Sequence, residues 1–208
     1  MLKPVKKEKI RREIMCLEYL YGCPHIVKLL DQVIDPSTKT PSIVTEYLPH
    51  HDFRVIYDSM TKEDIKRYIL QILIGLSHAH SFGIIHRDIK PGNVLMNMDF
   101  KTATIVDWGL ADFYLPNKRF NTRVASRYFK GPELLLNMNY YDYSLDIWST
   151  GCMLAGMVFE KEPFFRGIDN DDQMVRIAKV VGIEDVENYC AKFPTEYTEY
   201  FKEKRQNW

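Results

Sequence analysis

The 208-residue chain has 46% hydrophobic and 27% charged side chains, the composition of a globular protein with one domain or two small lobes. Its 28 basic and 28 acidic residues balance, so net charge by itself indicates no partner. No apolar run reaches membrane-spanning length, and the basic N-terminus lacks the apolar core of a signal peptide. Cys16, Cys23, Cys152 and Cys190 have neither zinc-site nor disulfide spacing. We therefore expect reduced thiols in a protein of the nucleus and cytoplasm, with no membrane partner.

The first fifty residues predict a helix and a hairpin. Apolar residues recur at helical spacing within residues 5–21, and the opposite face of this segment is basic. Residues 25–35 and 42–49 are rich in apolar and β-branched side chains and flank the turn sequence "PSTKT", which predicts a β-hairpin.

The remainder is predicted to be mainly helical. Thr61 followed by Asp64 is the capping signal of a long helix over residues 62–81, which Gly83 is expected to end. Further expected elements are short strands at 93–97 and 103–107, an irregular segment at 107–133, a buried helix at 144–164 and an amphipathic helix at 169–182. This order favours an α+β fold with a small lobe followed by a larger helical lobe.

The stretch "HRDIKPGN" at residues 86–93 concentrates groups that suit chemistry on a phosphate. Asp88 can accept a hydrogen bond from an attacking hydroxyl, and Lys90 can neutralise charge on a moving phosphoryl group. Asn93 offers a neutral oxygen, and Asp107, after the next predicted hairpin, offers an anionic one. Mg²⁺ prefers such oxygen ligands, so we expect Asn93 and Asp107 to be metal ligands.

Each of these features alone has a simpler explanation. Asp107–Gly109 resembles an ordinary turn, His86 a packed core histidine, and the charged loop a solvated surface. The joint order is more specific: H-R-D-x-K-x-x-N, a hairpin, D-x-G and then G-P-E. This order favours phosphoryl transfer over a chance arrangement.

The joint pattern resembles the eukaryotic protein kinases, and Lys90 stands where the Ser/Thr kinases have their lysine. The variants "DWG" and "GPE", with "RVASRYFKGPELL" and "YDYSLDIWSTGCMLA", make the chain most similar to the catalytic (alpha) subunits of casein kinase II. The resemblance covers essentially the whole chain. It implies a two-lobed kinase fold, with a partial small lobe at 1–48 and a helical lobe at 49–208.

The resemblance also implies roles for individual residues. Asp88 is the expected catalytic base, Lys90 the phosphate-neutralising group, and Asn93 and Asp107 the Mg²⁺ ligands. ATP is the expected phosphate donor, with GTP a second candidate. The residues expected around the nucleotide are Glu13, which orients a lysine, the gatekeeper Thr45, the hinge residues Glu46, Tyr47 and Leu48, and Leu95, Val106 and Asp107.

Two basic clusters predict the substrate class. They would attract a protein with acidic residues near its Ser or Thr, as the family does. Alone, the helix cluster could equally be a solvated face or a nucleic-acid or nuclear-import patch. The second cluster favours substrate recognition, with no nucleic-acid partner expected. The residues are Lys6, Lys7, Lys9 and Arg12 in the first cluster, and Arg123, Arg127 and Lys130 in the second.

The expected regulation and completeness also come from the resemblance. Arg87 is expected to need no phosphate on the activation segment, the irregular stretch at 107–133. No two glycines have the G-x-G spacing of a phosphate-covering loop. The family's ATP-binding lysine, and the arginine that pairs with the equivalent of Glu133, are expected to lie beyond the two ends of this sequence. We therefore expect a chain truncated at both ends, with weak activity or none.

Two other functions compete with an active kinase. One is a non-catalytic module that binds acidic peptides or the regulatory (beta) subunit of casein kinase II, partly through Val33 and Val44 on the hairpin. The other is a metal-dependent phosphohydrolase using Asp88, Asn93 and Asp107. The absence of a second carboxylate cluster or histidine ligands in the sequence argues against the phosphohydrolase.

Overall fold

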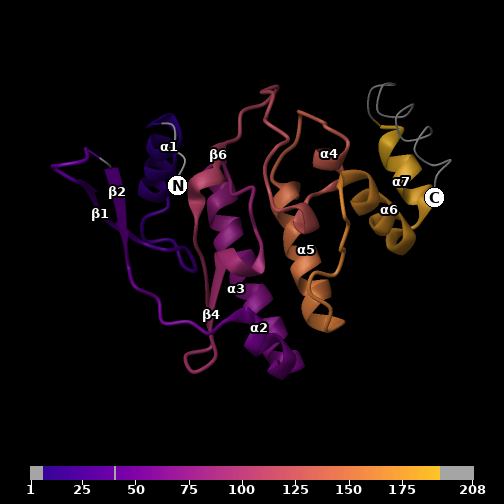
Figure 1. The fold of residues 1–208 in the computed structure, drawn as a ribbon, viewed down its shortest axis with the longest axis horizontal. Coiled ribbons are helices and arrows are strands. Elements are labelled where there is room, and N and C mark those ends of the chain that lie inside the picture. The colour runs from indigo at the N-terminus through magenta and orange to yellow at the C-terminus, as the bar shows by residue number, and fades with distance from the viewer. Residues whose placement is uncertain (1–6, 40, 193–208) are drawn as a thin grey trace.

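The computed structural model describes residues 7–39 and 41–192. In Figure 1 the α1 helix and the β1–β2 hairpin lie on one side, α3 and α5 run through the middle, and α6 and α7 lie on the other side. The elements are α1 (Lys7–Tyr19), β1 (Leu29–Ile34), β2 (Pro41–Thr45), α2 (Phe53–Ile56), α3 (Lys62–Ser81), β3 (Ile84–Ile85), β4 (Val94–Asn97), β5 (Thr102–Ile105), β6 (Asp112–Phe113), α4 (Pro132–Leu135), α5 (Ser144–Val158), α6 (Asn170–Val181) and α7 (Ile183–Cys190). The fold is thus mixed, with mainly helical structure after β6. The division of the chain at residue 48 remains a prediction.

The expected N-terminal helix and hairpin are both present. Helix α1 buries Leu17, and Leu20 directly after it, against the core. Strands β1 and β2 pair antiparallel, with Val33 opposite Ser42. The Asp35 carboxylate accepts hydrogen bonds from the backbone amides of Ser37 and Thr38 at the start of the turn, which fixes the chain reversal.

Helix α3 begins and ends as its sequence predicts. Thr61 and Asp64 form a complete capping box, in which each side chain accepts a hydrogen bond from the other residue's backbone amide. Phe82 is the C-terminal cap, and Gly83 follows with a φ of +75°, a left-handed conformation that glycine adopts without strain.

Two antiparallel strand pairs frame the segment between α3 and α4. The expected hairpin is β4–β5, in which Val94 pairs with Ile105. The pair β3–β6, with Ile85 opposite Asp112, was not predicted. Strands of two residues carry no readable periodicity, so their pairing depends on tertiary contacts.

The long apolar helix predicted at 144–164 is only partly buried. Helix α5 ends at Val158, and an exposed stripe runs along it at helical spacing. The stripe consists of Ser144, Ile147, Gly151, Leu154 and Val158. Apolar character on all faces therefore did not mean burial on all faces.

Helix α6 was expected, whereas three other helices along the chain were not predicted. Asp169 caps α6 through the backbone amide of Asp172, as its acidic start suggested. Helices α2, α4 and α7 were missed; α2 and α4 span four residues each, which is too short for a periodic signal. Over the described ranges, none of the helices combines the length and apolarity that a membrane span requires.

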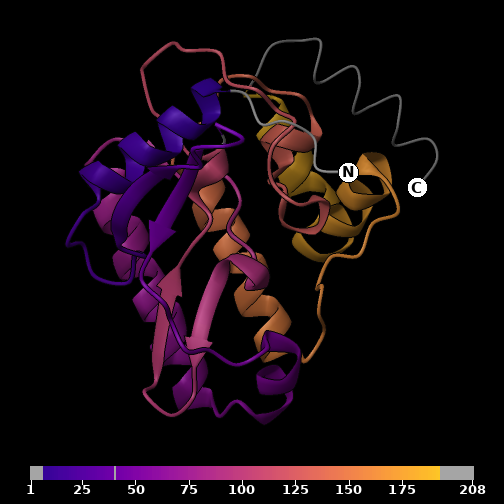
Figure 2. The same cartoon turned by 60° about the vertical axis from the view of Figure 1, so that its left-hand side comes forward.

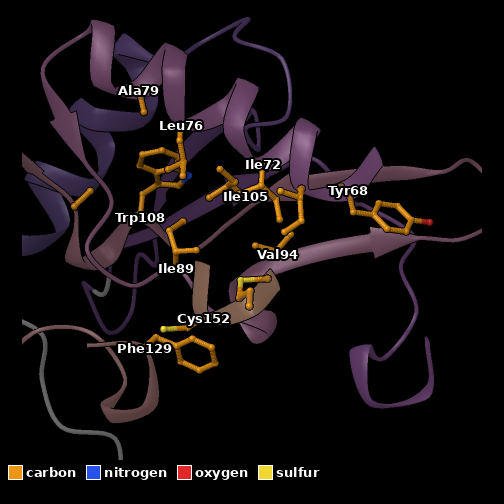
Figure 3. Packing of buried hydrophobic residues seen from close by; sticks show 14 of the residues in the cluster. Tyr68, Ile72, Leu76, Ala79, Ile89, Val94, Ile105, Trp108, Phe129 and Cys152 are labelled. Carbon is orange, nitrogen blue, oxygen red and sulfur yellow. The ribbon is translucent and has the colours of Figure 1, made fainter. Parts of the chain in front are cut away.

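The main core lies between α3, α5 and the β4–β5 hairpin. Figure 3 shows Ile72 and Leu76 of α3 facing Ile105 and Trp108, with Ile89 of the predicted catalytic loop (residues 86–93) beside them. Because Ile89 is fully buried within this cluster, the core fixes the position of the loop that contains Asp88 and Lys90.

Candidate active site

The loop after β3 is anchored to α5 by a buried carboxylate. Asp146 is fully buried and accepts hydrogen bonds from the backbone amides of His86 (2.9 Å) and Arg87 (2.8 Å). Its Oδ2 also lies 2.9 Å from Nε2 of His80. Arg87 has a φ of +68°, an uncommon backbone conformation that these bonds help to hold.

His86 completes the anchor from the other side. Its Nε2 lies 3.1 Å from the carbonyl oxygen of Val106, and its Nδ1 accepts from the backbone amide of Asp88 at 3.2 Å. Complete burial lowers the pKa of His86. A neutral ring with its proton on Nε2 satisfies both contacts. His86 is therefore a buried residue that links the loop to Val106, in agreement with the interpretation of it as a packed core histidine.

Asp88 lies at the centre of a hydrogen-bond network. Its Oδ2 accepts from Lys90 Nζ (2.7 Å) and Asn93 Nδ2 (3.0 Å), and its Oδ1 accepts from the backbone amide of Ser126 (3.0 Å). Ser126 Oγ bridges to Lys90 Nζ at 3.1 Å and to Asp88 Oδ1 at 3.3 Å. The structure thus brings together the three predicted catalytic side chains and adds Ser126. That residue is in the quoted "RVASRYF" segment, but its contact with Asp88 spans 38 positions and could not be predicted from spacing.

Asn93 and Asp107 come together through the β4–β5 hairpin. The backbone amide of Val106 donates to the carbonyl oxygen of Asn93 at 2.9 Å, so Asp107 follows directly after the residue facing Asn93. Asp107 is exposed and has a φ of +59°, and within residues 7–39 and 41–192 its Oδ1 accepts only a long bond, 3.4 Å, from the amide of Gly109. Its carboxylate is therefore available to a cation.

The donor set fits Mg²⁺. Asn93 uses its side-chain amide NH₂ on Asp88, and no donor in the described part of the chain occupies its side-chain oxygen, which can bind a cation. Within residues 7–39 and 41–192, no cluster of three His, Cys, Asp or Glu side chains has metal-site geometry. Mg²⁺ does not need one, because it commonly binds one or two carboxylates together with phosphate oxygens and water.

A cavity of about 190 Å³ opens beside Asp107. It is smaller than the roughly 300–1,000 Å³ of whole-ligand pockets, and so suits one part of a ligand. Its walls contain seven of the eight residues predicted to surround a nucleotide: Glu13, Thr45, Glu46, Leu48, Leu95, Val106 and Asp107, with Leu17, Val27 and Trp108. The exception is Tyr47, whose side chain is 87% exposed and does not line the cavity. The amide of Lys28 donates to Glu46 at 2.9 Å, and this bond holds the cavity edge against β1.

Glu13 extends from α1 into this cavity without a basic partner among the residues that the structure describes. Burial, and second the Asp107 carboxylate, raise the pKa of Glu13. Two facing carboxylates favour the binding of a cation between or beside them.

The sequence matches the family model described as the protein kinase domain over residues 2–206. The chain belongs to the protein kinase family. Members of this family transfer phosphoryl groups, generally with ATP and Mg²⁺. The Asp88 network and the adjoining cavity therefore lie in a kinase domain.

The basic residues predicted to bind substrate differ in their exposure to solvent and in their contacts. Lys6 lies outside the described residues, whereas Lys7 and Lys9 are exposed on α1. Arg12 lies 3.5 Å from Asp112 and is therefore partly neutralised. Helix α1 packs against the Trp108–Leu110 turn and β6.

In the second cluster, Arg123 and Arg127 are exposed, and Arg127 donates to the carbonyl oxygen of Ile168. Lys130 points inward and donates to the carbonyl oxygens of Val124 (2.7 Å) and Thr122 (3.4 Å). Burial, and second the nearby Arg127, lower the pKa of Lys130. Its ammonium thus holds the activation segment, and its part in substrate binding stays a prediction.

Proposed function

We propose that this kinase is a Ser/Thr protein kinase of the casein kinase II type, which transfers the γ-phosphate of ATP to Ser or Thr near acidic residues. The observation that carries the proposal is the Asp88–Lys90–Asn93–Ser126 network beside the exposed Asp107. Mg²⁺ and ATP, when bound, supply the phosphoryl group and neutralise its charge.

In this proposal Asp88 orients the acceptor hydroxyl and takes its proton. Lys90 stays within 2.7 Å of Asp88 and is positioned to offset charge on the phosphoryl oxygens. Asn93 and Asp107 bind the metal, since both present an oxygen without a strong internal donor. Ser126 ties the activation segment to Asp88, so the segment that receives the peptide and the group that activates its hydroxyl are held together.

The acidic substrate class rests on the two exposed arginines of the activation segment. Arg123 and Arg127 present positive charge within a few residues of Ser126, which contacts Asp88. Charge complementarity with acidic side chains near the acceptor follows from this placement. Lys7 and Lys9 add a more distant positive surface.

We also propose the regulatory beta subunit of casein kinase II as a partner at the hairpin. The β1–β2 hairpin presents Leu30, Val33, Ile34 and Val44 to solvent. Exposed apolar side chains on a two-stranded sheet suit burial against another protein. This interaction would be additional to catalysis.

The proposal is tested with the full 208-residue chain, Mg²⁺-ATP or Mg²⁺-GTP, and matched peptides. One peptide carries Asp and Glu after its Ser, and the other carries Ala at the same positions. We expect only weak phosphate transfer to the acidic peptide, because no two glycines have the spacing of a phosphate-covering loop, and a further loss on the order of a thousandfold in kcat for Asp88→Asn. Equal, negligible transfer by the wild-type and variant chains would refute the catalytic proposal. Binding of the acidic peptide without transfer would then favour the non-catalytic module.

A further inference from the structure

A cavity of about 290 Å³ lies among helices α4, α5, α6 and α7 and shares no lining residue with the cavity beside Asp107. Figures 1 and 2 show α4, α6 and α7 grouped together. Much of the wall is apolar, with Ile177, Val181 and Val186 among the lining side chains. The volume is close to the lower limit, roughly 300 Å³, of sites that enclose a whole small ligand. The cavity therefore suits a ligand made of one ring and a short polar group.

The charged side chains that line this cavity are acidic. They are Glu133 and Asp185, and no Lys, Arg or His in the described part of the chain lines it. Glu133 is 7% exposed, and within the described residues its own backbone amide is the one hydrogen-bond donor to its carboxylate. Burial first, and then the Asp142 and Asp146 carboxylates, raise the pKa of Glu133. Because a buried carboxylate without a cation is unfavourable, the cavity favours a positively charged ligand over a neutral or negative one.

The aromatic part of the wall supports the same class of ligand. Trp148 and Tyr189 contribute rings to the cavity, and aromatic faces attract cations. The indole nitrogen of Trp148 is buried and has no hydrogen-bond acceptor among the described residues, so a second polar group of this wall is also unsatisfied. A flat amidinium group can donate two parallel hydrogen bonds to a carboxylate while its ring packs against aromatic and aliphatic side chains.

We propose that this cavity is a binding site for a small organic cation with an apolar body, such as an aromatic amidinium or guanidinium ion. The Glu133 carboxylate is the counter-ion of the cationic group, and the exposed Asp185 adds negative charge at the wall. Because four helices form the walls, a bound cation stabilises their packing against one another. The site lies outside the Asp88 network, and the inference does not depend on phosphate transfer, so the failure of the proposed function would leave it standing.

Calorimetric titration of the full 208-residue chain with benzamidine hydrochloride at pH 8, where Glu133 is ionised, tests the proposal. Benzamide, a neutral molecule of nearly the same shape, is the control ligand. We expect benzamidine to bind at least about tenfold more tightly than benzamide, and Glu133→Gln to weaken benzamidine binding by about tenfold or more. Glu63→Gln, which alters an exposed pair with Lys66, is the matched control variant and should bind benzamidine as the wild type does.

Two further measurements show whether the cation binds in this cavity. Val181→Phe narrows the cavity without altering the carboxylate and should weaken benzamidine binding by about tenfold. The NMR signal of the Trp148 indole N–H, assigned with Trp148→Phe, should shift when benzamidine is added to the wild type. At ten times its Kd, benzamidine should also raise the melting temperature of the wild type by about 3–5 °C.

Several results would overturn the proposal. They are the absence of benzamidine binding, equal affinities for benzamidine and benzamide, wild-type affinity in Glu133→Gln, and a Trp148 signal that does not respond. Should Glu133→Gln not fold, the Val181→Phe affinity decides: a loss supports the site, and wild-type affinity places the cation elsewhere.

Discussion

Glu133 makes the stability of this kinase depend on pH in a direction opposite to that of most carboxylates. It lies in α4 and lines an apolar cavity of about 290 Å³ together with Trp148, Ile177 and Tyr189. It forms no ion pair within residues 7–39 and 41–192. Burial raises the pKa of Glu133 to about 7. The perturbation that tests this assignment is Glu133→Gln, a neutral side chain of nearly the same shape.

The size of the effect follows from the two pKa values. The carboxyl group has an ordinary pKa of 4.5 in the unfolded chain and about 7 in the fold. The folded state therefore binds the proton more tightly, and its stability falls as pH rises from 4.5 through 7. At about 1.4 kcal/mol per pH unit, the loss approaches 3 kcal/mol at pH 8. We expect Glu133→Gln to match the wild type near pH 4 and to exceed its free energy of unfolding by about 3 kcal/mol at pH 8.

Urea unfolding at a series of pH values measures this difference. Glu63→Gln, which alters an exposed pair with Lys66, is the matched control and should show no such divergence. At pH 8 the melting temperature of Glu133→Gln should exceed that of the wild type by on the order of 10 °C. If Glu133→Gln is instead less stable at pH 8, a cation outside the described residues must neutralise the carboxylate, and the reasoning is wrong.

Two other outcomes are expected. Thr61→Ala removes half of the α3 capping box and should cost about 1 kcal/mol in the free energy of unfolding, measured by urea titration; no change would show that the cap is redundant. Leu95→Ala removes apolar contact from the cavity and should raise the KM or Kd for Mg²⁺-ATP by about tenfold. Tyr47→Ala, at an exposed position, should leave it within about twofold. Equal effects at these two positions would contradict the assignment of the cavity to the nucleotide.

The parts of the fold that could be predicted are those whose signals are local. The cap of α3 requires residues three positions apart, and the β4–β5 hairpin requires two short strands and a polar turn between them. The contacts that hold the catalytic loop are different. Asp146 binds residues about 60 positions away, and Asp112 gathers cations from three separate segments. No spacing rule gives such partners.

The candidate site shows the same division. The motif residues Asp88, Lys90 and Asn93 lie within six positions, and the structure places them in one network. The inward direction of Lys130 could not be anticipated, because a basic residue in a loop looks the same in sequence whether it faces solvent or backbone carbonyls. Tyr47 differs in the opposite direction. Its position in the chain suggested contact with the nucleotide, but its side chain points into solvent.

The contacts of Ser126 with Asp88 affect whether water or a peptide can reach the Asp88 carboxylate. Both oxygens of Asp88 are occupied, one by Lys90 and Asn93 and the other by the amide and hydroxyl of Ser126. A water molecule that approaches the carboxylate must displace one of these donors, and its few contacts cannot compensate for the lost hydrogen bond. A docked peptide can compensate for this loss, because its many other interactions hold its hydroxyl against the same carboxylate. In the proposed mechanism, this arrangement would disfavour hydrolysis of bound ATP relative to transfer to a docked peptide.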